Sequence, residues 1–208
     1  MTMSAIPRPV LFEAGPWRAQ PISEADAPRL QAFFDANPLY FVTVNGRPAG
    51  PGDALAELTE RPPPEMSYRE LHWLTFVDEA GSLQGVANVL SDLLAPGVWH
   101  TGLFIVATAL HGTGAARRLY EALEAWMQRG GARWLRLGVV LGNARAEAFW
   151  QRMGYTEVRQ RLNVDTGGRL NTIRVMAKPL TVDAHLETYL SLVQRDRPES
   201  DCSPQHKA

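Results

Sequence analysis

The stretch Leu103–Arg117, which reads LFIVATALHGTGAAR, decides the fold. An apolar strand expected over 100–106 runs through a turn of small residues into an amphipathic helix expected over 112–130. The bare backbone of such a turn lets its N–H groups approach an anion, and the start of the helix adds unpaired donors and the positive end of its dipole. The amides of His111–Ala116 are therefore expected to bind a diphosphate, with Arg117 adding positive charge.

Taken alone, a glycine cluster of this kind is equally compatible with a simple tight turn between strand and helix. The cluster does not match a dinucleotide-binding fingerprint, because the acidic residue at the end of the next strand is missing. It also lacks the Gly-Lys-Ser/Thr ending of a P-loop. Evidence from elsewhere in the chain has to decide between a site and a turn.

The remaining elements follow from hydrophobic period and turn chemistry. Strands are expected over 17–21, 71–77, 83–90, 100–106, 134–140, 155–164 and 171–178. One helix is expected to start at a cap on Ser23 and to end before Pro38, and others over 52–59, 112–130, 145–153 and 182–194. Residues 1–15 are interpreted as a lead-in, 16–180 as one α/β domain, and 181–208 as a C-terminal helix with a disordered tail beginning at Arg195.

A second motif, Asn143–Tyr155, follows the strand after the glycine turn. Together the two segments resemble the GNAT superfamily of acyltransferases. His111, Gly114 and Ala116 match its Gln/Arg-x-x-Gly-x-Gly/Ala motif, with His in the first place. The later family motif is matched by Asn143, Ala146, Phe149, Trp150, Gly154 and Tyr155.

The resemblance implies a GNAT fold: a mixed, largely antiparallel sheet of about seven strands, splayed between the fourth and fifth, with about four helices and a C-terminal helix. It also implies acetyl-CoA as co-substrate, with its pantetheine arm between the splayed strands. The residues expected to bind it are Phe104, Ile105, Val106, His111, Gly112, Thr113, Gly114, Ala115, Ala116, Arg117, Asn143 and Trp150.

The catalytic groups depart from the family pattern. Trp150 occupies the place where many members have a Tyr that protonates the leaving thiolate, and an indole N–H cannot do this at neutral pH. His100 is the first candidate for the general base, because His titrates near neutral pH, although a structural role at the strand end stays open. Asp92, Glu70 and Tyr40 are weaker candidates for that role.

Tyr40, Phe41 and Trp99 are the expected acceptor-binding residues, with core packing as the alternative for the first two. The expected reaction is acetyl transfer to a primary amine of a small molecule by direct attack. A protein or peptide N-acetyltransferase and a non-catalytic acyl-CoA-binding sensor remain alternatives, and acyl preference and acceptor stay open.

Composition narrows the remaining classes. A formal net charge of -1 gives no reason to expect a nucleic-acid or membrane partner. Cys202 is the one cysteine, so neither an internal disulfide nor a cysteine-based metal site is expected. We expect a cytoplasmic enzyme without a metal. The apolar face of the C-terminal helix must bury against its own domain or a second subunit, which makes a homodimer possible.

Overall fold

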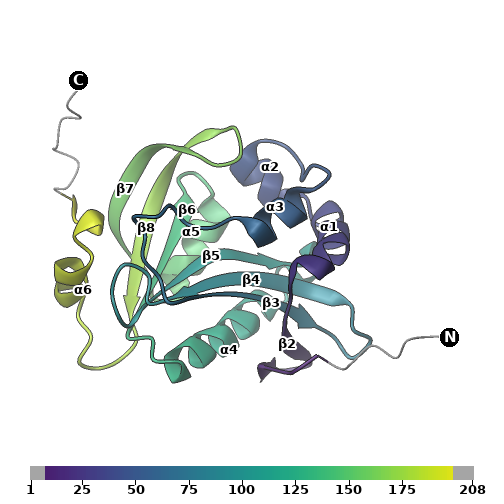
Figure 1. Ribbon diagram of the computed structural model, residues 1–208, viewed down its shortest axis with the longest axis horizontal. Helices are drawn as coiled ribbons and strands as arrows, with labels where there is room; N and C mark the ends of the chain where they lie inside the picture. The colour runs from purple at the N-terminus through teal and green to yellow at the C-terminus, as the bar shows by residue number, and fades with distance from the viewer. Residues whose placement is uncertain (1–7, 199–208) are drawn as a thin grey trace.

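A single mixed sheet of eight strands forms the centre of the molecule, in the order β1-β2-β3-β4-β5-β6-β8-β7 (Figure 1). The computed structural model describes residues 8–198. The strands are β1 (Phe12–Ala14), β2 (Trp17–Pro21), β3 (Glu70–Val77), β4 (Leu83–Ser91), β5 (Val98–Val106), β6 (Trp134–Val140), β7 (Thr156–Asp165) and β8 (Leu170–Pro179). The helices are α1 (Ala27–Ala36), α2 (Leu39–Asn45), α3 (Asp53–Thr59), α4 (Ala115–Arg129), α5 (Ala144–Arg152) and α6 (Leu186–Leu192).

The parallel pair β5–β6 opens part of the way along its length. Its paired residues are Val98–Thr101 on β5 and Trp134–Leu137 on β6. Past Thr101, β5 stays paired with β4, while β6 continues alongside β8. Gly102 is the extra residue of a bulge on β5, since Asn88 faces Leu103 and Val89 faces Thr101. The expected splay between these two strands is therefore present, and it begins at the bulge.

The two faces of the sheet are covered differently. On one face, α4 and α5 bury Leu119, Leu123 and Trp150 against the sheet. On the other, α1–α3 cover the β3–β5 half, and α6 covers the β6–β8 half. In Figure 1, α4 lies below the sheet, whereas α1–α3 and α6 lie at opposite sides of the molecule. Between those two groups the second face has no helix directly over it in the described chain.

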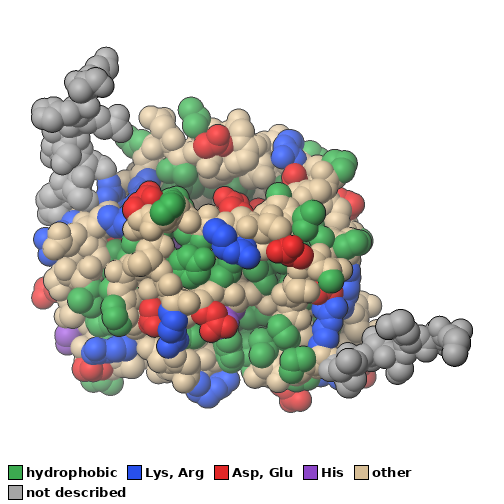
Figure 2. All heavy atoms as spheres, viewed as in Figure 1, with side chains coloured by type: hydrophobic (Ala, Val, Ile, Leu, Met, Phe, Trp, Pro, Cys, Tyr) green, Lys and Arg blue, Asp and Glu red, His purple; other side chains and the backbone are tan. Residues whose placement is uncertain are grey.

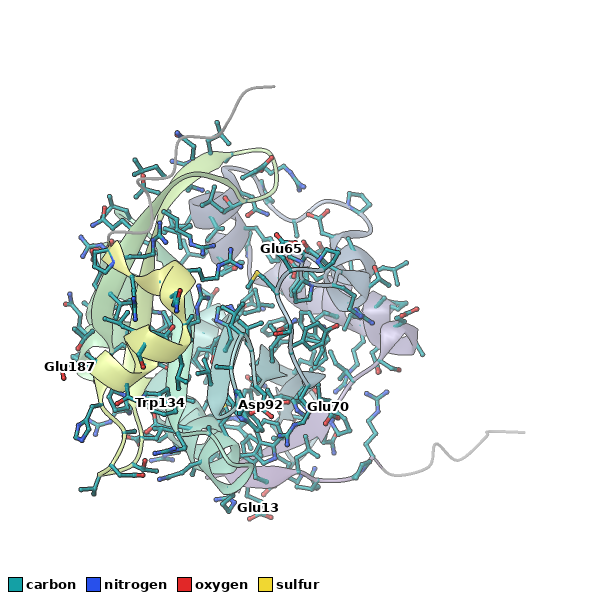
Figure 3. All side chains as sticks on the ribbon, turned by 60° about the vertical axis from the view of Figure 1, so that its left-hand side comes forward. Glu13, Glu65, Glu70, Asp92, Trp134 and Glu187 are labelled. Carbon is teal, nitrogen blue, oxygen red and sulfur yellow. The ribbon has the colours of Figure 1, made fainter. Side chains whose placement is uncertain are left out.

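The C-terminal helix packs against its own domain. Tyr189 and Val193 are buried with Trp134 and Val175 of the sheet, and the Trp134 indole N–H donates to the carbonyl of His185 at 3.1 Å. Figure 3 shows Trp134 at the base of α6 and Glu187 pointing outward. This helix therefore gives no structural reason for a second subunit.

Four sequence expectations need correction. The lead-in contains β1, so the sheet has eight strands instead of about seven, and α2 raises the number of helices to six. The C-terminal helix begins at Leu186, because Val182 is fully exposed and precedes a turn. The expected disorder does not begin at Arg195, since Gln194–Asp196 form a 3₁₀ turn in which Asp196 is fully buried. Residues 199–208, which the same prediction covered, lie outside the described chain. Within residues 8–198, every helix is too short or too polar to cross a bilayer.

Candidate functional site

Two connected cavities open where β5 and β6 diverge. The outer cavity, of about 590 Å³, lies between the start of α4 and α5, and the inner cavity, of about 330 Å³, lies over the exposed face of β5 and β6. Both are lined by Tyr40, Phe104, Asn143, Ala146 and Trp150. The shared lining makes one passage from the helix N-terminus to the centre of the sheet. On the face shown in Figure 2, acidic and basic side chains are interspersed.

The glycine turn presents unpaired backbone donors to the outer cavity. Gly112 and Gly114 have φ of 81° and 85°, and a Cβ on either would meet no atom within 4 Å. Within residues 8–198, the N–H groups of Gly112, Gly114, Ala116 and Arg117 have no hydrogen-bond partner. Four free donors at the start of a 15-residue helix are the arrangement by which helix N-termini attract anions.

Two residues of that turn have structural tasks instead. The Thr113 hydroxyl donates to the carbonyl of Leu110 at 2.7 Å and accepts from the Ala115 N–H at 3.3 Å. Ala115 is buried, and neither residue lines the outer cavity. The expectation that both bind the diphosphate directly is thus not supported, because their groups are used within the turn.

His111 lines the outer cavity but has no proton to offer an anion. Its Nε2 lies 3.0 Å from the carbonyl oxygen of Val106, and because that oxygen only accepts, Nε2 carries the ring proton. Burial lowers the pKa of His111, and the charge of Arg145 lowers it further, so the ring is neutral and Nδ1 has no proton. Within the described residues, Nδ1 is also buried without a partner. His111 fixes the turn against β5 instead of donating to phosphate.

The backbone of β5 turns two peptide groups toward the gap. The Ala107 N–H donates to Gln84 on β4 at 2.9 Å, and the Ile105 carbonyl also lies against β4. Because peptide groups alternate along a strand, those of Phe104 and Val106 face the gap between β5 and β6. Ile105 lines the outer cavity, but its peptide group is not available to a bound molecule. The expected contact is therefore limited to Phe104 and to the N–H of Val106.

Asn143 and Trp150 hold the far wall of the passage. The Asn143 side chain caps α5, with Oδ1 accepting from the Ala146 N–H at 3.2 Å. Trp150 is 8% exposed and packs edge-on against Tyr120, with ring centroids 4.8 Å apart. The Tyr155 hydroxyl is hydrogen-bonded to that of Tyr120 in the core behind the wall. Tyr155 is thus a core residue, and Trp150 forms an apolar wall.

Of the three expected acceptor-binding aromatics, only Tyr40 reaches a cavity. Phe41 is 1% exposed and packs on Phe34, with the ring centroids 4.6 Å apart. It differs from Tyr40 because adjacent residues of a helix point in different directions. Trp99 is stacked on His72 beneath α4, on the face opposite to His100. Phe41 and Trp99 are therefore corrected to core residues, whereas Tyr40 lines both cavities.

His100 lines the inner cavity but is poorly suited to act as a general base. Its Nδ1 lies 3.1 Å from the carbonyl oxygen of Arg136 and 3.3 Å from a guanidinium nitrogen of the same residue. Burial, followed by the charge of Arg136, lowers the pKa of His100 to about 3. A group this weakly basic cannot hold a proton taken from an ammonium at neutral pH. The structure therefore argues against the expected catalytic role of His100.

Two of the three weaker base candidates, Glu70 and Asp92, lie outside both cavities. Glu70 begins β3 and Asp92 follows β4, at the same end of that hairpin (Figure 3). Asp92 accepts from the Gly97 N–H at 2.7 Å and pairs with Arg69 at 3.2 Å, and Glu70 lies 3.6 Å from His72. Neither carboxylate lines either of the two cavities. Asp92 holds the loop before β5, and Glu70 contacts its own strand.

Several residues that line the cavities belong to neither of the two sequence motifs. The outer cavity includes Arg145 and Arg152, and the inner one Arg136 and Arg161. Arg136 gave a usable signal, because a charged residue inside the buried strand Trp134–Val140 requires a partner. Asn37 ties α1 to the outer cavity, since its Oδ1 accepts from the Thr108 N–H at 2.6 Å.

The comparisons with known proteins agree with this geometry. The model of the acetyltransferase (GNAT) family matches residues 16–155, more than half of the chain. An acetyltransferase from Thermus thermophilus superposes with a TM-score of 0.63 at 21% identity, over 83% of this chain and 100% of that one.

Two further solved structures share the fold. The ribosomal-protein-S18-alanine N-acetyltransferase of Escherichia coli has a TM-score of 0.57 at 18% identity, over 81% of this chain and 99% of that one. A spermidine N-acetyltransferase from Vibrio cholerae, solved with CoA and spermine, has a TM-score of 0.60 at 16% identity, over 79% and 96%. The sequence has no significant match among curated proteins. The family model and the splayed sheet together show that the chain belongs to the GNAT family of acetyltransferases.

Proposed function

We propose that this protein transfers an acetyl group from acetyl-CoA to the primary amine of a small molecule. The observation that carries the proposal is the row of free N–H groups at Gly112, Gly114, Ala116 and Arg117, directed to a cavity that continues into the gap between β5 and β6. A diphosphate followed by a long, narrow arm with two amide groups has the shape and chemistry to fill that passage.

The arginines of the outer cavity support the same co-substrate. Arg145 and Arg152 of α5 line it together with Arg117 of α4, and no Asp or Glu lies among its described lining residues. Arg117 also pairs with Glu121 at 2.7 Å, but both side chains are largely exposed, so that bond is weak competition for a phosphate. The phosphates of CoA would therefore meet amide donors and positive charge together.

The reaction that fits is direct attack. The amine nitrogen bonds to the thioester carbonyl carbon, the carbon–sulfur bond breaks, and the proton that the nitrogen loses ends on the departing thiolate, which gives the amide and the free thiol of CoA. Desolvation in the inner cavity and the positive charge of Arg161 both lower the pKa of a bound amine, which favours its neutral, nucleophilic form. A dedicated base is then less important, in keeping with the low pKa of His100.

Tyr40 is the residue that we assign to the departing thiolate. It lines both cavities and therefore lies where the thioester would lie. Burial raises the pKa of Tyr40 above its ordinary value, and the charge of Glu57 adds to this. Its hydroxyl stays protonated at neutral pH and can donate a hydrogen bond to sulfur, a role that Trp150 cannot take.

The roof of the inner cavity favours a small acceptor over a protein side chain. The Thr166 hydroxyl and the Asn171 amide, both from the β7–β8 hairpin, donate to the Val44 carbonyl of α2 at 2.9 and 2.8 Å. The same hairpin and helix lie side by side in Figure 1. An extended polypeptide would have to displace these contacts, whereas a small amine would not.

A thermal-shift series with acetyl-CoA, CoA, ATP and NAD tests the proposal. A ligand at about 100 times its Kd adds about 2.7 kcal/mol of stability, so only the CoA species should raise Tm. Release of free thiol in the presence of small amines then measures transfer. Stabilisation by ATP or NAD instead of CoA would refute the co-substrate, and CoA binding without amine-dependent thiol release would indicate a sensor.

A further inference from the structure

Among the described residues, both cavities are lined by cationic groups and by no carboxylate. The charged residues in the lining of the inner cavity are Arg136 of β6 and Arg161 of β7, and its His100 is neutral. Glu57, whose charge acts on Tyr40, lines neither cavity. Burial and the charges of Glu60 and Asp53 raise its pKa to about 7. The phosphates of CoA account for the arginines of the outer cavity. They do not account for those of the inner one, at the other end of the passage.

One buried carboxylate neutralises Arg136. Asp196 is fully buried and accepts from Nε and Nη2 of Arg136 at 2.7 and 3.0 Å, and it also accepts from the Tyr189 hydroxyl. Burial favours the neutral form of an isolated arginine, yet these contacts keep the pKa of Arg136 above its ordinary value. Arg136 is thus a satisfied structural cation, and Asp196 has little acceptor capacity left.

Arg161 has no comparable partner in the described chain. Its closest carboxylate oxygen is that of Asp196, at 3.9 Å, which is too long for a hydrogen bond. The Arg161 side chain is 26% exposed, so its guanidinium is partly desolvated while its five N–H donors lack a described hydrogen-bond partner. Burial, Arg195 and Arg136 lower the pKa of Arg161 to about 10, so it is still charged at neutral pH.

From this geometry we infer that the acceptor carries a carboxylate, which Arg161 binds in the inner cavity. The inference rests on the proposed function and deepens it: the acceptor is a small amino acid-like amine and not a polyamine. A polyamine would bring two or more positive charges next to Arg161, with no carboxylate in the described lining to receive them. A carboxylate would fill the missing place, and the planar fork of arginine fits it in a bidentate manner.

Calorimetric binding tests this without relying on turnover. The probes are glycine, β-alanine and γ-aminobutyrate, each compared with its own carboxamide, together with spermidine, titrated into the protein with and without CoA. The three acids differ in the spacing between amine and carboxylate, so one of them should match the distance from Arg161 to the reacting centre. Each acid and its amide differ in the group that Arg161 would bind.

Arg161→Gln is the test variant and Arg129→Gln the control, because Arg129 is exposed at the end of α4 and changes the net charge equally. At least one acid should bind roughly 10- to 100-fold more tightly than its amide, the range expected for hydrogen bonds to a charged group. That preference should vanish in Arg161→Gln, persist in Arg129→Gln, and return in part with Arg161→Lys. The thermal midpoint of each variant shows that it is folded.

Equal binding of acids and amides, including no measurable binding of either, would overturn the inference. Binding of spermidine more tightly than of the acids would do the same, and so would a preference for the acids that Arg161→Gln leaves unchanged. A separate titration with acetyl-CoA keeps the two proposals apart. If acetyl-CoA binds while the acids show no preference, the proposed function survives and the carboxylate site does not. If acetyl-CoA fails to bind, the proposed function falls, whatever the amino acids do.

Discussion

Replacement of Asp196 by asparagine removes the counter-charge of a buried guanidinium while keeping the shape of the side chain. Asp196 is 0% exposed and holds Arg136 through two hydrogen bonds of 2.7 and 3.0 Å. An asparagine would place at most one acceptor oxygen opposite the two N–H groups of Arg136, and its own NH₂ would need another partner. The Arg136 side chain is 6% exposed, so its charge would stay largely buried without this counter-charge.

Removal of one partner from a buried ion pair costs about 3–5 kcal/mol. For a chain of this size, the loss corresponds to about 6–20 °C in Tm, and in urea it should appear as a lower midpoint at unchanged m. Burial raises the pKa of Asp196, but the hydrogen bonds and charge of Arg136 outweigh burial, so the pKa lies below 3.8. The stabilisation is therefore complete at neutral pH and is lost as pH falls through the folded-state pKa.

Asp183→Asn is the matched control. Asp183 also pairs with an arginine, Arg133, at 2.6 Å, but the two side chains are 72% and 46% exposed. Solvent screens that pair, so its loss should leave the unfolding midpoint unchanged within error. If Asp196→Asn lowers stability no more than Asp183→Asn does, or if its effect persists unchanged at pH 2, the argument from a buried ion pair is wrong.

Three further predictions concern the glycine turn, the buried Glu57, and the aromatic pair Tyr40 and Trp99. Gly114→Glu should raise the Kd for acetyl-CoA more than about 100-fold by calorimetry, because the new side chain adds bulk and a negative charge beside the phosphates. The positive φ at Gly114 makes the substitution cost about 1–2 kcal/mol of stability as well. Unchanged affinity in the folded variant would contradict the site. Burial raises the pKa of Glu57 to about 7 from 4.5, so wild-type stability should fall as pH rises between these values. Glu57→Gln should therefore be more stable than wild type by up to about 3 kcal/mol at pH 8 and should gain nothing at pH 4, as measured by urea unfolding. The control Glu65→Gln, at an exposed position, should leave the urea midpoint unchanged at both pH values. Tyr40→Phe should lower kcat for amine-dependent thiol release by roughly 10-fold or more, with little change in Tm. Trp99→Ala should cost about 3–5 kcal/mol of stability and leave the KM for the amine unchanged. A loss of stability in the first variant and a loss of turnover in the second would exchange the roles of the two residues.

The backbone part of the site could be predicted because its signal is local. Gly112 and Gly114 leave the turn bare, and the apolar strand before it and the amphipathic helix after it are periodic patterns. The same periodicity could have excluded Trp99 from the site, since neighbouring residues of a strand point to opposite faces. His100 and Trp99 cannot both line the cavity, and the structure places His100 there.

The side-chain part was not predictable in the same way, because its residues are far apart in sequence. Arg161 of β7 and Arg136 of β6 meet Asp196 of the C-terminal segment, and the order β6-β8-β7 is what brings them together. Composition alone favoured disorder from Arg195 onward, since the segment is polar. A single buried ion pair overrides that tendency, and only the arginine inside the apolar strand Trp134–Val140 hinted at it in the sequence.

This difference explains why membership of the family does not determine the acceptor. In the function proposed above, CoA binds through peptide N–H groups of one strand, one turn and one helix, which any sequence with the right small residues can supply. The inner cavity instead takes its charge from side chains on β6 and β7, and one carboxylate near the C-terminus decides how much of that charge is left. Loss of the Asp196 carboxylate would add a second uncompensated cation to the inner cavity. On the inference drawn above, the C-terminal segment thus contributes to the electrostatic preference of a cavity that it does not line.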